Sequence, residues 1–316
     1  MDKAFVLGAG LGTRLRPLTD QLPKPLIPVF HKPLITHAFD HLLAAGVREL
    51  IVNTHHLPQC YDVAFPEKKY RNAPLTFRHE PVLLETAGGI ANIADLVRDE
   101  SFLVYNGDIL TDLPLAPLLQ AHSEGKNIIT LVLRSTGPSQ HIAFDAERGC
   151  VTDIRNKLST GNASAHLFTG IYAVRPDFLQ HLETGKIESV IPVFLKLIQQ
   201  GARIGGVVID EGLWWDLGDK ASYLAAHHTL HELGERFPDY TKSETRIAIS
   251  NEARIDPRAL LQGLNVISAG AQVGAGAVLE DCILWPDARV APSAKLERCI
   301  VRSGCCAEGI LADAAV

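Results

Sequence analysis

The residues with the clearest chemical potential lie near the start of the chain, where residues 8–29 read GAGLGTRLRPLTDQLPKPLIPV. Its closely spaced glycines permit close backbone approach, and their N–H groups can face phosphate oxygens. Arg14 adds a planar guanidinium fork, and Lys24, fixed between two prolines, adds a point charge. This combination predicts a polyphosphate-binding site. The alternative is a structural turn that carries two surface cations.

Two familiar phosphate-binding motifs fail in this segment. A dinucleotide-binding fingerprint needs its third glycine where Thr13 stands, and it needs a long helix that the prolines from Pro17 to Pro33 forbid. A P-loop needs Gly-Lys followed by serine or threonine, which this segment lacks. The segment therefore predicts a phosphate loop of another type.

A second group of candidates is acidic. Asp108 follows the apolar run 102–105, which we expect to be a buried strand, and ligands collect at the carboxyl ends of strands in open α/β sheets. Asp216 follows two tryptophans after another expected strand. Carboxylates combined with phosphate oxygens and water suit Mg²⁺. The alternative for Asp108 alone is a turn or helix-capping aspartate.

Histidines and cysteines give weaker signals. The pairs His37/His41 and His227/His231 have the i, i+4 spacing of helical metal ligands, but no acidic partner completes either site, so we interpret them as solvated or capping histidines. Cys305 and its neighbour Cys306 are interpreted as filling of a repeat rather than as a redox pair.

The elements that must position these residues alternate in type up to about residue 232. Strands are expected at residues 4–7, 49–52, 75–77, 102–105, 128–133, 170–174 and 204–209. Helices are expected at residues 34–45, 89–97, 115–122, 190–199 and 221–233. This alternation predicts an α/β domain with a mostly parallel sheet, to which residues 142–145 and 151–154 add a hairpin.

The composition changes after residue 233. Residues 234–250 are polar and are expected to be a linker. From Ile255 onward one aliphatic residue recurs every six positions, with a one-residue slip before Leu284. A hexapeptide period with small residues between the aliphatic ones predicts a parallel β-helix of about three coils over residues 251–316. The alternative is a disordered tail rich in glycine and alanine.

Composition excludes several classes of function. The formal net charge of −6 argues against a general nucleic-acid or anionic-membrane binder, which needs a basic face. The scattered cysteines contain no CxxC pair and predict neither a disulfide scaffold nor a structural zinc site. The chain has no apolar stretch of about eighteen residues, and its first residues, MDKAFVLGAG, are not expected to act as a signal peptide. We expect a reduced, soluble, cytoplasmic protein.

The glycine-rich string resembles the signature of sugar-1-phosphate nucleotidyltransferases. LLETAGGI, FLVYNGDIL, FTGIYAV and WWDLGD follow in the order typical of that family, and the resemblance covers residues 3–232. It implies a Rossmann-like, GT-A-like catalytic domain with a mixed, mostly parallel sheet over residues 1–233. The tail is similar to the left-handed β-helix of many family members.

The resemblance implies that a sugar-1-phosphate oxygen attacks the α-phosphorus of a nucleoside triphosphate and that pyrophosphate leaves, with Mg²⁺ as cofactor. Catalytic roles are implied for Arg14, Lys24 and Asp108, and Mg²⁺ ligation for Asp108 and Asp216. The residues implied in nucleotide binding are Gly8, Ala9, Gly10, Gly12, Thr13, Arg14, Glu85, Thr86, Gly88 and Asn106. The residues implied in sugar-phosphate binding are Lys24, Lys157, Thr169 and Gly170.

Two parts of this assignment carry expectations of their own. Gly88 and Gly89 are expected to leave room for a flat base above Glu85, whose carboxylate can accept from guanine N1–H and N2–H₂ or from uracil N3–H. Many family members carry Glu-Lys-Pro after the hairpin, whereas this chain reads DIRNKL, so Lys157, with Arg155 behind it, is the substitute for the sugar-phosphate lysine.

Within the family, the signature string and the tail favour guanylyl transfer to mannose 1-phosphate. Uridylyl transfer to N-acetylmuramate 1-phosphate or another hexose 1-phosphate is the alternative, favoured by the motifs ETAGGI and NGDILTD. A regulatory subunit without catalysis and an acyltransferase built on the β-helix are further alternatives. We expect GTP or UTP and a sugar 1-phosphate as ligands. We also expect the tail to pack on the catalytic domain or on a second chain and to form a homo-oligomer.

Overall fold

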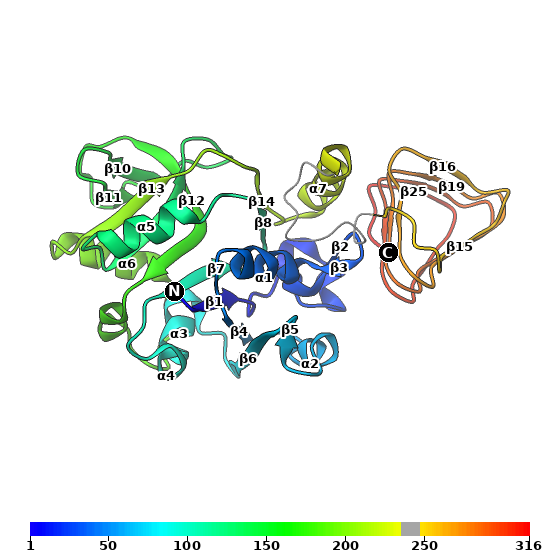
Figure 1. Cartoon of the computed structure of the whole chain (residues 1–316). Coiled ribbons are helices and arrows are strands. Elements are labelled where there is room, and N and C mark those ends of the chain that lie inside the picture. The colour runs from blue at the N-terminus through cyan, green and yellow to red at the C-terminus, as the bar shows by residue number, and fades with distance from the viewer. Residues whose placement is uncertain (235–246) are drawn as a thin grey trace. The chain divides into compact units, whose positions relative to one another are not determined.

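The computed structural model describes residues 1–234 and 247–316, and the chain divides into two compact units (Figure 1). The first unit comprises Met1–Leu11 and His37–Trp214, and the second comprises Gly12–Thr36 and Trp215–Val316. The glycine-rich segment is therefore divided between the units after Leu11. Most of the linker expected at residues 234–250 lies outside the described residues. Neither described range contains a helix long and apolar enough to cross a membrane.

A mixed sheet forms the centre of the first unit, and its ten strands among the described residues have the order β10-β11-β13-β9-β12-β7-β1-β4-β6-β5. The strands are β1 (Lys3–Leu7), β4 (Glu49–Thr54), β5 (Lys69–Tyr70), β6 (Ala73–His79), β7 (Phe102–Asn106), β9 (Ile129–Arg134), β10 (Ile142–Asp145), β11 (Cys150–Ile154), β12 (Ser164–Val174) and β13 (Ile204–Val208). Strands β7, β1, β4 and β6 are mutually parallel, and β9 is parallel to β13. The α/β class and the hairpin of β10 and β11 are confirmed.

Strand β12 is longer than the sequence predicted. The expected strand began at Gly170, but β12 starts at Ser164 and runs antiparallel to both β7 and β9. Its register against β9 shifts between Phe168 and Tyr172, where Gly170 has a φ of +83°. A bulge interrupts the alternation of side chains between the two faces of a sheet, and this hides the first half of the strand from a pattern search.

Helices cover both faces of this sheet (Figure 1). They are α1 (Leu34–Ala44), α2 (Gln59–Ala64), α3 (Glu85–Asn92), α4 (Ala94–Val97), α5 (Ala116–Glu124) and α6 (Val190–Gln199). Apolar side chains of α3, α4 and α6 share one core with Val104 and Leu131 of the sheet. The next residues along those strands point to the other face, where Tyr105 contacts His41 of α1, and Thr130 contacts His122 of α5.

Two expectations about helices need correction. The helix expected at residues 89–97 is two helices: α3 begins at Glu85 and ends at Asn92, and α4 begins at Ala94. The histidines His41 and His227 are buried rather than solvated. His41 Nε2 donates to the Leu113 carbonyl oxygen at 2.8 Å, and Nδ1 accepts from the Tyr105 hydroxyl at 3.0 Å. Burial lowers the pKa of each histidine to about 4.

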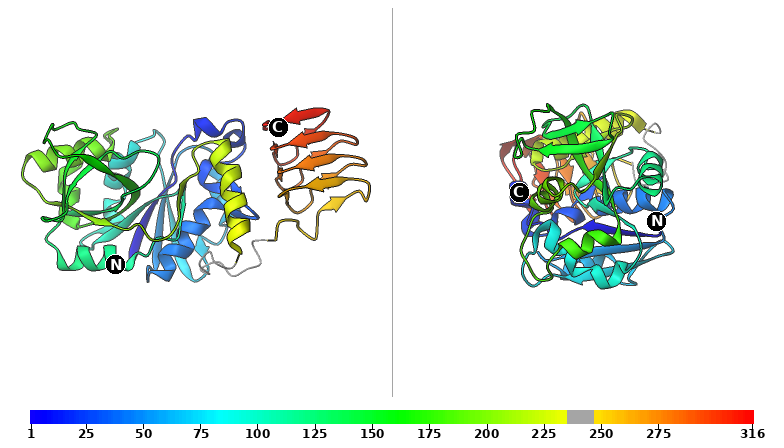
Figure 2. Two further views of the ribbon diagram at one scale, coloured as in Figure 1. Left: turned by 90° about the horizontal axis from the view of Figure 1, so that it is seen from above. Right: turned by 90° about the vertical axis from the view of Figure 1, so that its left-hand side faces the viewer.

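The second unit contains the predicted β-helix, seen edge-on as stacked rungs in Figure 2. Its short strands are β15 (Arg254–Ile255), β16 (Leu260–Gln262), β17 (Val266–Ile267), β18 (Gln272–Val273), β19 (Val278–Glu280), β20 (Ile283–Leu284), β21 (Arg289–Val290), β22 (Lys295–Glu297), β23 (Ile300–Val301), β24 (Cys306–Ala307) and β25 (Ile310–Ala312). They stack in parallel as three sheets, so the described residues form three full coils and part of a fourth. The predicted period is confirmed, because the repeating aliphatic residues point inward.

The one-residue slip of the repeat has a structural location. Ile255 pairs with Val273 and Val273 with Val290, so the coil shortens from 18 residues to 17. The shortened corner contains Asp281 at a φ of +52°, and its carboxylate accepts from the Leu264 N–H at 2.8 Å. Cys282, next along the chain, fills the core. The interpretation of Cys306 as filling is wrong, because its side chain is exposed.

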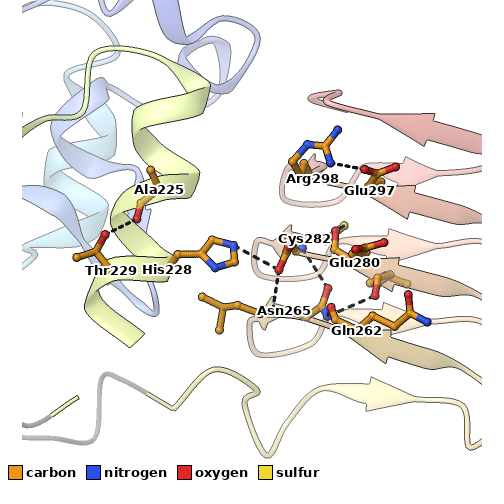
Figure 3. Close-up of polar contacts among 12 residues, drawn as sticks. Ala225, His228, Thr229, Gln262, Asn265, Glu280, Cys282, Glu297 and Arg298 are labelled. Atoms are coloured by element: carbon orange, nitrogen blue, oxygen red, sulfur yellow. Dashed lines mark hydrogen bonds and ion pairs between the residues drawn. The ribbon is translucent and has the colours of Figure 1, made fainter. Parts of the chain in front are cut away.

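Within the second unit, the β-helix packs on α7 (Lys220–Leu233) and on Gly12–Thr36. Trp285 Nε1 donates to the Tyr223 hydroxyl at 3.1 Å, and that hydroxyl donates to the Pro28 carbonyl oxygen. Gln21 Nε2 donates to the Ser303 carbonyl oxygen at 3.1 Å. His228 Nε2 lies 3.3 Å from Asp281 Oδ1. Figure 3 shows the His228 side chain pointing from α7 toward the coils of the β-helix. The tail therefore contacts the same segment that carries Arg14 and Lys24.

Candidate nucleotide-binding and catalytic site

The glycine-rich segment begins at the carboxyl end of β1, where Gly8 is held through both of its peptide groups. The Gly8 N–H donates to Asn53 Oδ1 at 2.7 Å, and the Tyr61 hydroxyl donates to the Gly8 carbonyl oxygen at 2.8 Å. A Cβ atom at this position would lie 2.7 Å from the Asn53 carbonyl oxygen. Gly8 is thus required by close packing, and its N–H is engaged by Asn53. Ala9 is buried beside it, whereas Gly10 is exposed with open space around it.

In the second unit, Gly12 starts the turn that carries Arg14. Gly12 has a φ of +60° and precedes a short 3₁₀ helix, Thr13–Leu15. Its carbonyl oxygen accepts from the Leu15 N–H and from the Thr19 hydroxyl, both at 3.0 Å. A Cβ atom at Gly12 would lie 2.8 Å from Thr19 Cγ2. The left-handed backbone and the tight packing both favour glycine here.

Arg14 and Lys24 converge on the carboxylate of Asp216, although the three residues come from distant motifs of the second unit. Lys24 Nζ donates to Asp216 Oδ1 at 3.2 Å, and an Arg14 guanidinium nitrogen lies 3.7 Å from Asp216 Oδ2. The Lys24 side chain is only 8% exposed, against 68% for Arg14 and 41% for Asp216. A buried ammonium needs a negative partner, and an accessible carboxylate is one that a phosphate group can replace.

Asp108 lies in the first unit, two residues beyond the end of β7. The preceding Gly107 N–H donates to the Leu7 carbonyl oxygen at 3.0 Å, and a Cβ atom at Gly107 would lie 2.5 Å from that oxygen. This contact holds the Asp108 turn against the end of β1, where the glycine-rich segment begins. The half-buried Asn106 and Asp108 therefore stand at the carboxyl end of β7, next to the end of the parallel strand β1, the usual place of ligands in such sheets.

The LETAGG segment forms the start of α3. Glu85 is exposed and has a φ of +61°. The Thr86 hydroxyl accepts from the Val190 N–H at 2.7 Å, which ties this segment to the first turn of α6. A Cβ atom at Gly88 would lie 2.2 Å from the Lys186 carbonyl oxygen. The space beside Gly88 is therefore filled by backbone, which corrects the expectation that this glycine leaves room for a flat base.

The residues expected at the sugar phosphate differ in accessibility. Lys157 is exposed on the turn after β11, and the buried carboxylate of Asp153 organises that turn by accepting from the Leu158 N–H at 3.0 Å. Thr169 is buried at the bulge of β12, where its hydroxyl donates to the Val132 carbonyl oxygen at 3.0 Å. The expectation that the Thr169 side chain lines the sugar site is therefore corrected. Gly170 approaches Asn106 so closely that a Cβ atom would lie 2.5 Å from Asn106 Nδ2.

Sequence reasoning missed three residues that shape the site: Asn53, Tyr61 and Glu80. Asn53 lies near the end of β4, Tyr61 lies in the short helix α2, and Glu80 follows β6. None of them belongs to a recognisable motif, so their positions gave little signal. Among residues 1–234 and 247–316, no three His, Cys, Asp or Glu side chains gather into a group that could hold a metal ion.

Comparison with known proteins identifies the family to which this chain belongs. Residues 3–232 match the family described as nucleotidyl transferase. The mannose-1-phosphate guanylyltransferase of Mycobacterium tuberculosis is 30% identical over 304 residues, which cover 93% of this chain and 83% of the relative. The N-acetylmuramate alpha-1-phosphate uridylyltransferase of Neisseria meningitidis is 34% identical over 218 residues, which cover 68% of this chain and 93% of the relative.

The chain therefore belongs to the nucleotidyl transferase family. Within that family it is a sugar-1-phosphate nucleotidyltransferase, as its resemblance predicted. A solved structure agrees in fold: the UDP-glucose pyrophosphorylase from Acinetobacter baumanii superposes with a TM-score of 0.61 at 19% identity, over 76% of this chain and 95% of that protein. The prediction of an enzyme of this class is confirmed.

Proposed function

We propose that the enzyme transfers a guanylyl group from GTP to mannose 1-phosphate and releases pyrophosphate. The convergence of Arg14 and the buried Lys24 on Asp216 supports a site for a triphosphate. The choice of substrate is supported by the Mycobacterium tuberculosis guanylyltransferase, whose similarity extends over 93% of this chain and so includes the β-helix. All four residues with implied catalytic or metal-binding roles are present, which favours an enzyme over a regulatory subunit.

The chemistry needs cations rather than a general base. The attacking oxygen of a sugar 1-phosphate is already an anion, so the difficulty is to bring two polyanions together and to stabilise charge at the α-phosphorus. Arg14 would hold the phosphates that leave as pyrophosphate, and Lys24 would contact the α-phosphate and the incoming sugar phosphate. Phosphate oxygens would then replace the Asp216 carboxylate as the partner of both cations.

The acidic residues fit Mg²⁺ by donor type. Asp108 and Asp216 offer carboxylate oxygens, the ligands that this hard cation prefers, and phosphate oxygens and water would complete its coordination. When bound, Mg²⁺ would neutralise developing charge on the phosphates. Asp216 faces Lys24 and Arg14 in this structure, and it would be freer to ligate Mg²⁺ once those cations contact the triphosphate.

The exposed carboxylate of Glu85 is the residue that we assign to the base. It can accept two hydrogen bonds from guanine or one from uracil, so uridylyl transfer to N-acetylmuramate 1-phosphate is the second candidate. The 34% identity to the Neisseria meningitidis uridylyltransferase favours that candidate. We assign the sugar phosphate to Lys24 and the exposed Lys157. A homo-oligomer formed through the β-helix also remains our proposal, and light scattering on the same preparation tests it.

A grid of substrates decides between the two candidates. Pyrophosphate release is measured for GTP, UTP, ATP and dTTP, each with mannose 1-phosphate, glucose 1-phosphate and N-acetylmuramate 1-phosphate. We expect GTP with mannose 1-phosphate to give a kcat/KM at least about tenfold above every other pair, a difference of about 1.4 kcal/mol. A higher value for UTP with N-acetylmuramate 1-phosphate would establish the second candidate instead. Omission of Mg²⁺ and the variant Lys24→Met are the negative controls, and Lys126→Met is a matched surface control.

A further inference from the structure

Glu80 is a fully buried carboxylate of the first unit to which the reaction assigns no role. It follows β6 and has no solvent exposure. Asn53 Nδ2 donates to Glu80 Oε1 at 2.8 Å, and the Leu84 N–H donates to Oε2 at 3.1 Å. A buried carboxylate is costly unless such donors surround it. Each of its two oxygens therefore has a specific partner, and the two partners lie on different segments.

Asn53 continues this chain of hydrogen bonds to the glycine-rich segment. It lies buried near the carboxyl end of β4, and its Oδ1 accepts from the Gly8 N–H at 2.7 Å. One amide thus accepts from Gly8 and donates to Glu80, which only a side chain with both functions can do. The resulting path is Gly8 N–H to Asn53, Asn53 to Glu80, and Leu84 N–H to Glu80. It joins the residue that opens the phosphate segment to the residue just before Glu85.

A third segment packs on the same pair. A Cβ atom at Gly89 of α3 would lie 3.0 Å from Asn53 Nδ2 and 3.1 Å from Glu80 Oε1. The helix that starts at Glu85 is therefore fitted against the Asn53–Glu80 contact. Strands β1, β4 and β6 are adjacent in the sheet, so the ends of all three strands are connected through buried polar groups. Fully satisfied buried networks fix a local structure strongly, whereas one broken link leaves a buried group unpaired.

We propose that Asn53 and Glu80 are positioning residues that couple the phosphate segment at Gly8–Leu11 to the base-binding segment at Leu84–Thr86. This inference rests on the proposed function for the identity of the two segments. Neither side chain contacts substrate, because both are buried. Their effect is to hold the two segments at a fixed separation, so that the base and the triphosphate of one nucleotide bind together.

Exchanging the amide of Asn53 and the carboxylate of Glu80 between the two positions tests this coupling. Asn53→Asp places two carboxylates in contact and removes the donor to Glu80. Glu80→Gln directs a new amide N–H₂ at either Asn53 Nδ2 or the Leu84 N–H, so one link fails. In the double variant, the new carboxylate at position 53 accepts from Gly8 and from the new amide at position 80, whose oxygen accepts from Leu84. All three hydrogen bonds are then restored, with one of them reversed in direction.

We expect each single variant to raise the KM for the triphosphate about tenfold while the KM for the sugar phosphate stays within about twofold. The double variant should return to within about threefold of the original enzyme. Asp40→Asn is the matched control, since Asp40 is a buried carboxylate of α1 that accepts from the Tyr70 hydroxyl and pairs with Arg71. It should lower the melting temperature without a selective change in the KM for the triphosphate.

Amide hydrogen exchange gives a readout that does not depend on turnover. Glu80→Gln should raise exchange at residues 8–11, and the double variant should reverse that rise. Unchanged exchange at residues 8–11, the same selective KM change in Asp40→Asn, or no recovery in the double variant would each overturn the coupling. If Asn53→Asp fails to fold, Glu80→Gln and the double variant carry the test. The substrate grid on the original enzyme decides the proposed function separately.

Discussion

In the first unit, Gly8 is held by Asn53 and Tyr61 through hydrogen bonds that are buried from water, whereas in the second unit Arg14 and Lys24 rest on the accessible carboxylate of Asp216. The first arrangement fixes a shape, because no ligand can reach those groups to replace them. The second arrangement keeps both cations available to a ligand, because a phosphate oxygen can take the place of Asp216. The first unit thus fixes the backbone at Gly8, whereas the second unit holds two cations whose negative partner can be exchanged for a phosphate.

Substitution of Asp108 and of Asp216 should show the difference between these two arrangements most clearly. Asp108→Asn should lower kcat by about a thousandfold or more without a large change in melting temperature, since a neutral amide is a poor Mg²⁺ ligand. Asp216→Asn should lower both, because it also removes the Asp216 carboxylate that faces the buried Lys24 ammonium. Steady-state kinetics and thermal melts measure both effects. Near-normal turnover of Asp108→Asn in the presence of Mg²⁺ would contradict the metal assignment, and Asp177→Asn is the surface control.

Variants of Arg14 test the exchangeable ion pair with Asp216 alone. Arg14→Ala should cost about 2–4 kcal/mol of transition-state stabilisation, the scale of losing one charged donor to a developing anion. Arg14→Lys should recover only part of the loss, because the guanidinium fork is gone. The melting temperature should hardly move in either variant, since most of this side chain is exposed. A fully active lysine variant would show that Arg14 is only a surface charge.

Both units bury neutral histidines, His41 and His122 in the first and His227 in the second, and acid should destabilise both units. His227 Nε2 accepts from the Phe30 N–H at 3.0 Å, while His41 Nδ1 accepts from the Tyr105 hydroxyl, so protonation would break a buried hydrogen bond in each. The folded pKa of about 4 lies below the unfolded value of 6.5. The unfolded chain therefore binds more protons between these values, and stability is complete above pH 6.5 and falls below it.

By pH 5 the loss should be on the order of 2 kcal/mol for each of these two histidines. Urea unfolding at pH 7 and pH 5 measures it, and His41→Gln should remove its share of the difference. A difference in unfolding free energy that His41→Gln leaves unchanged would contradict the assignment for the first unit.

A pair of tryptophans gives the smallest expected effects. Trp285→Phe removes the donor to the Tyr223 hydroxyl in the second unit, and Trp214→Phe removes the donor to the Thr169 carbonyl oxygen in the first. Each lost hydrogen bond should cost about 1 kcal/mol, and the smaller phenyl ring should add a cavity cost of about the same size at the fully buried Trp285. Differential scanning calorimetry compares the two variants. A loss above about 4 kcal/mol in Trp285→Phe would exceed the hydrogen bond and the cavity together, and would mean that the β-helix depends on this contact far more strongly.

Patterns in the sequence predicted those elements whose residues repeat or run together. The apolar runs of β1 and β7 and the six-residue period from Ile255 onward identified their strands, because burial demands that spacing. The first half of β12 escaped because a bulge at Gly170 changes its alternation. Helix α2 is short and its sequence, QCYDVA, shows too little apolar periodicity to be recognised.

The site was only partly predictable for a different reason. Motifs identified Arg14, Lys24 and Asp216 one by one, but their convergence depends on contacts between segments 192 residues apart. Asn53 and Glu80 carry no motif at all, since their role comes from the register of β4 against β6. The i, i+4 spacing of His37 and His41 says nothing about burial, which is decided by the sheet beneath α1.

The division of the second unit between Gly12–Thr36 and Trp215–Val316 affects how the chain folds during synthesis. Lys24 emerges early, whereas Asp216 follows 192 residues later. At roughly 5 to 20 residues per second, a ribosome needs roughly 10 to 40 seconds to cover that distance. During this interval the segment with Leu18 and Ile27, both buried in the finished protein, lacks the part of its own unit that begins at Trp215. The cation pair of the enzyme is thus among the first parts to be made and among the last to be assembled.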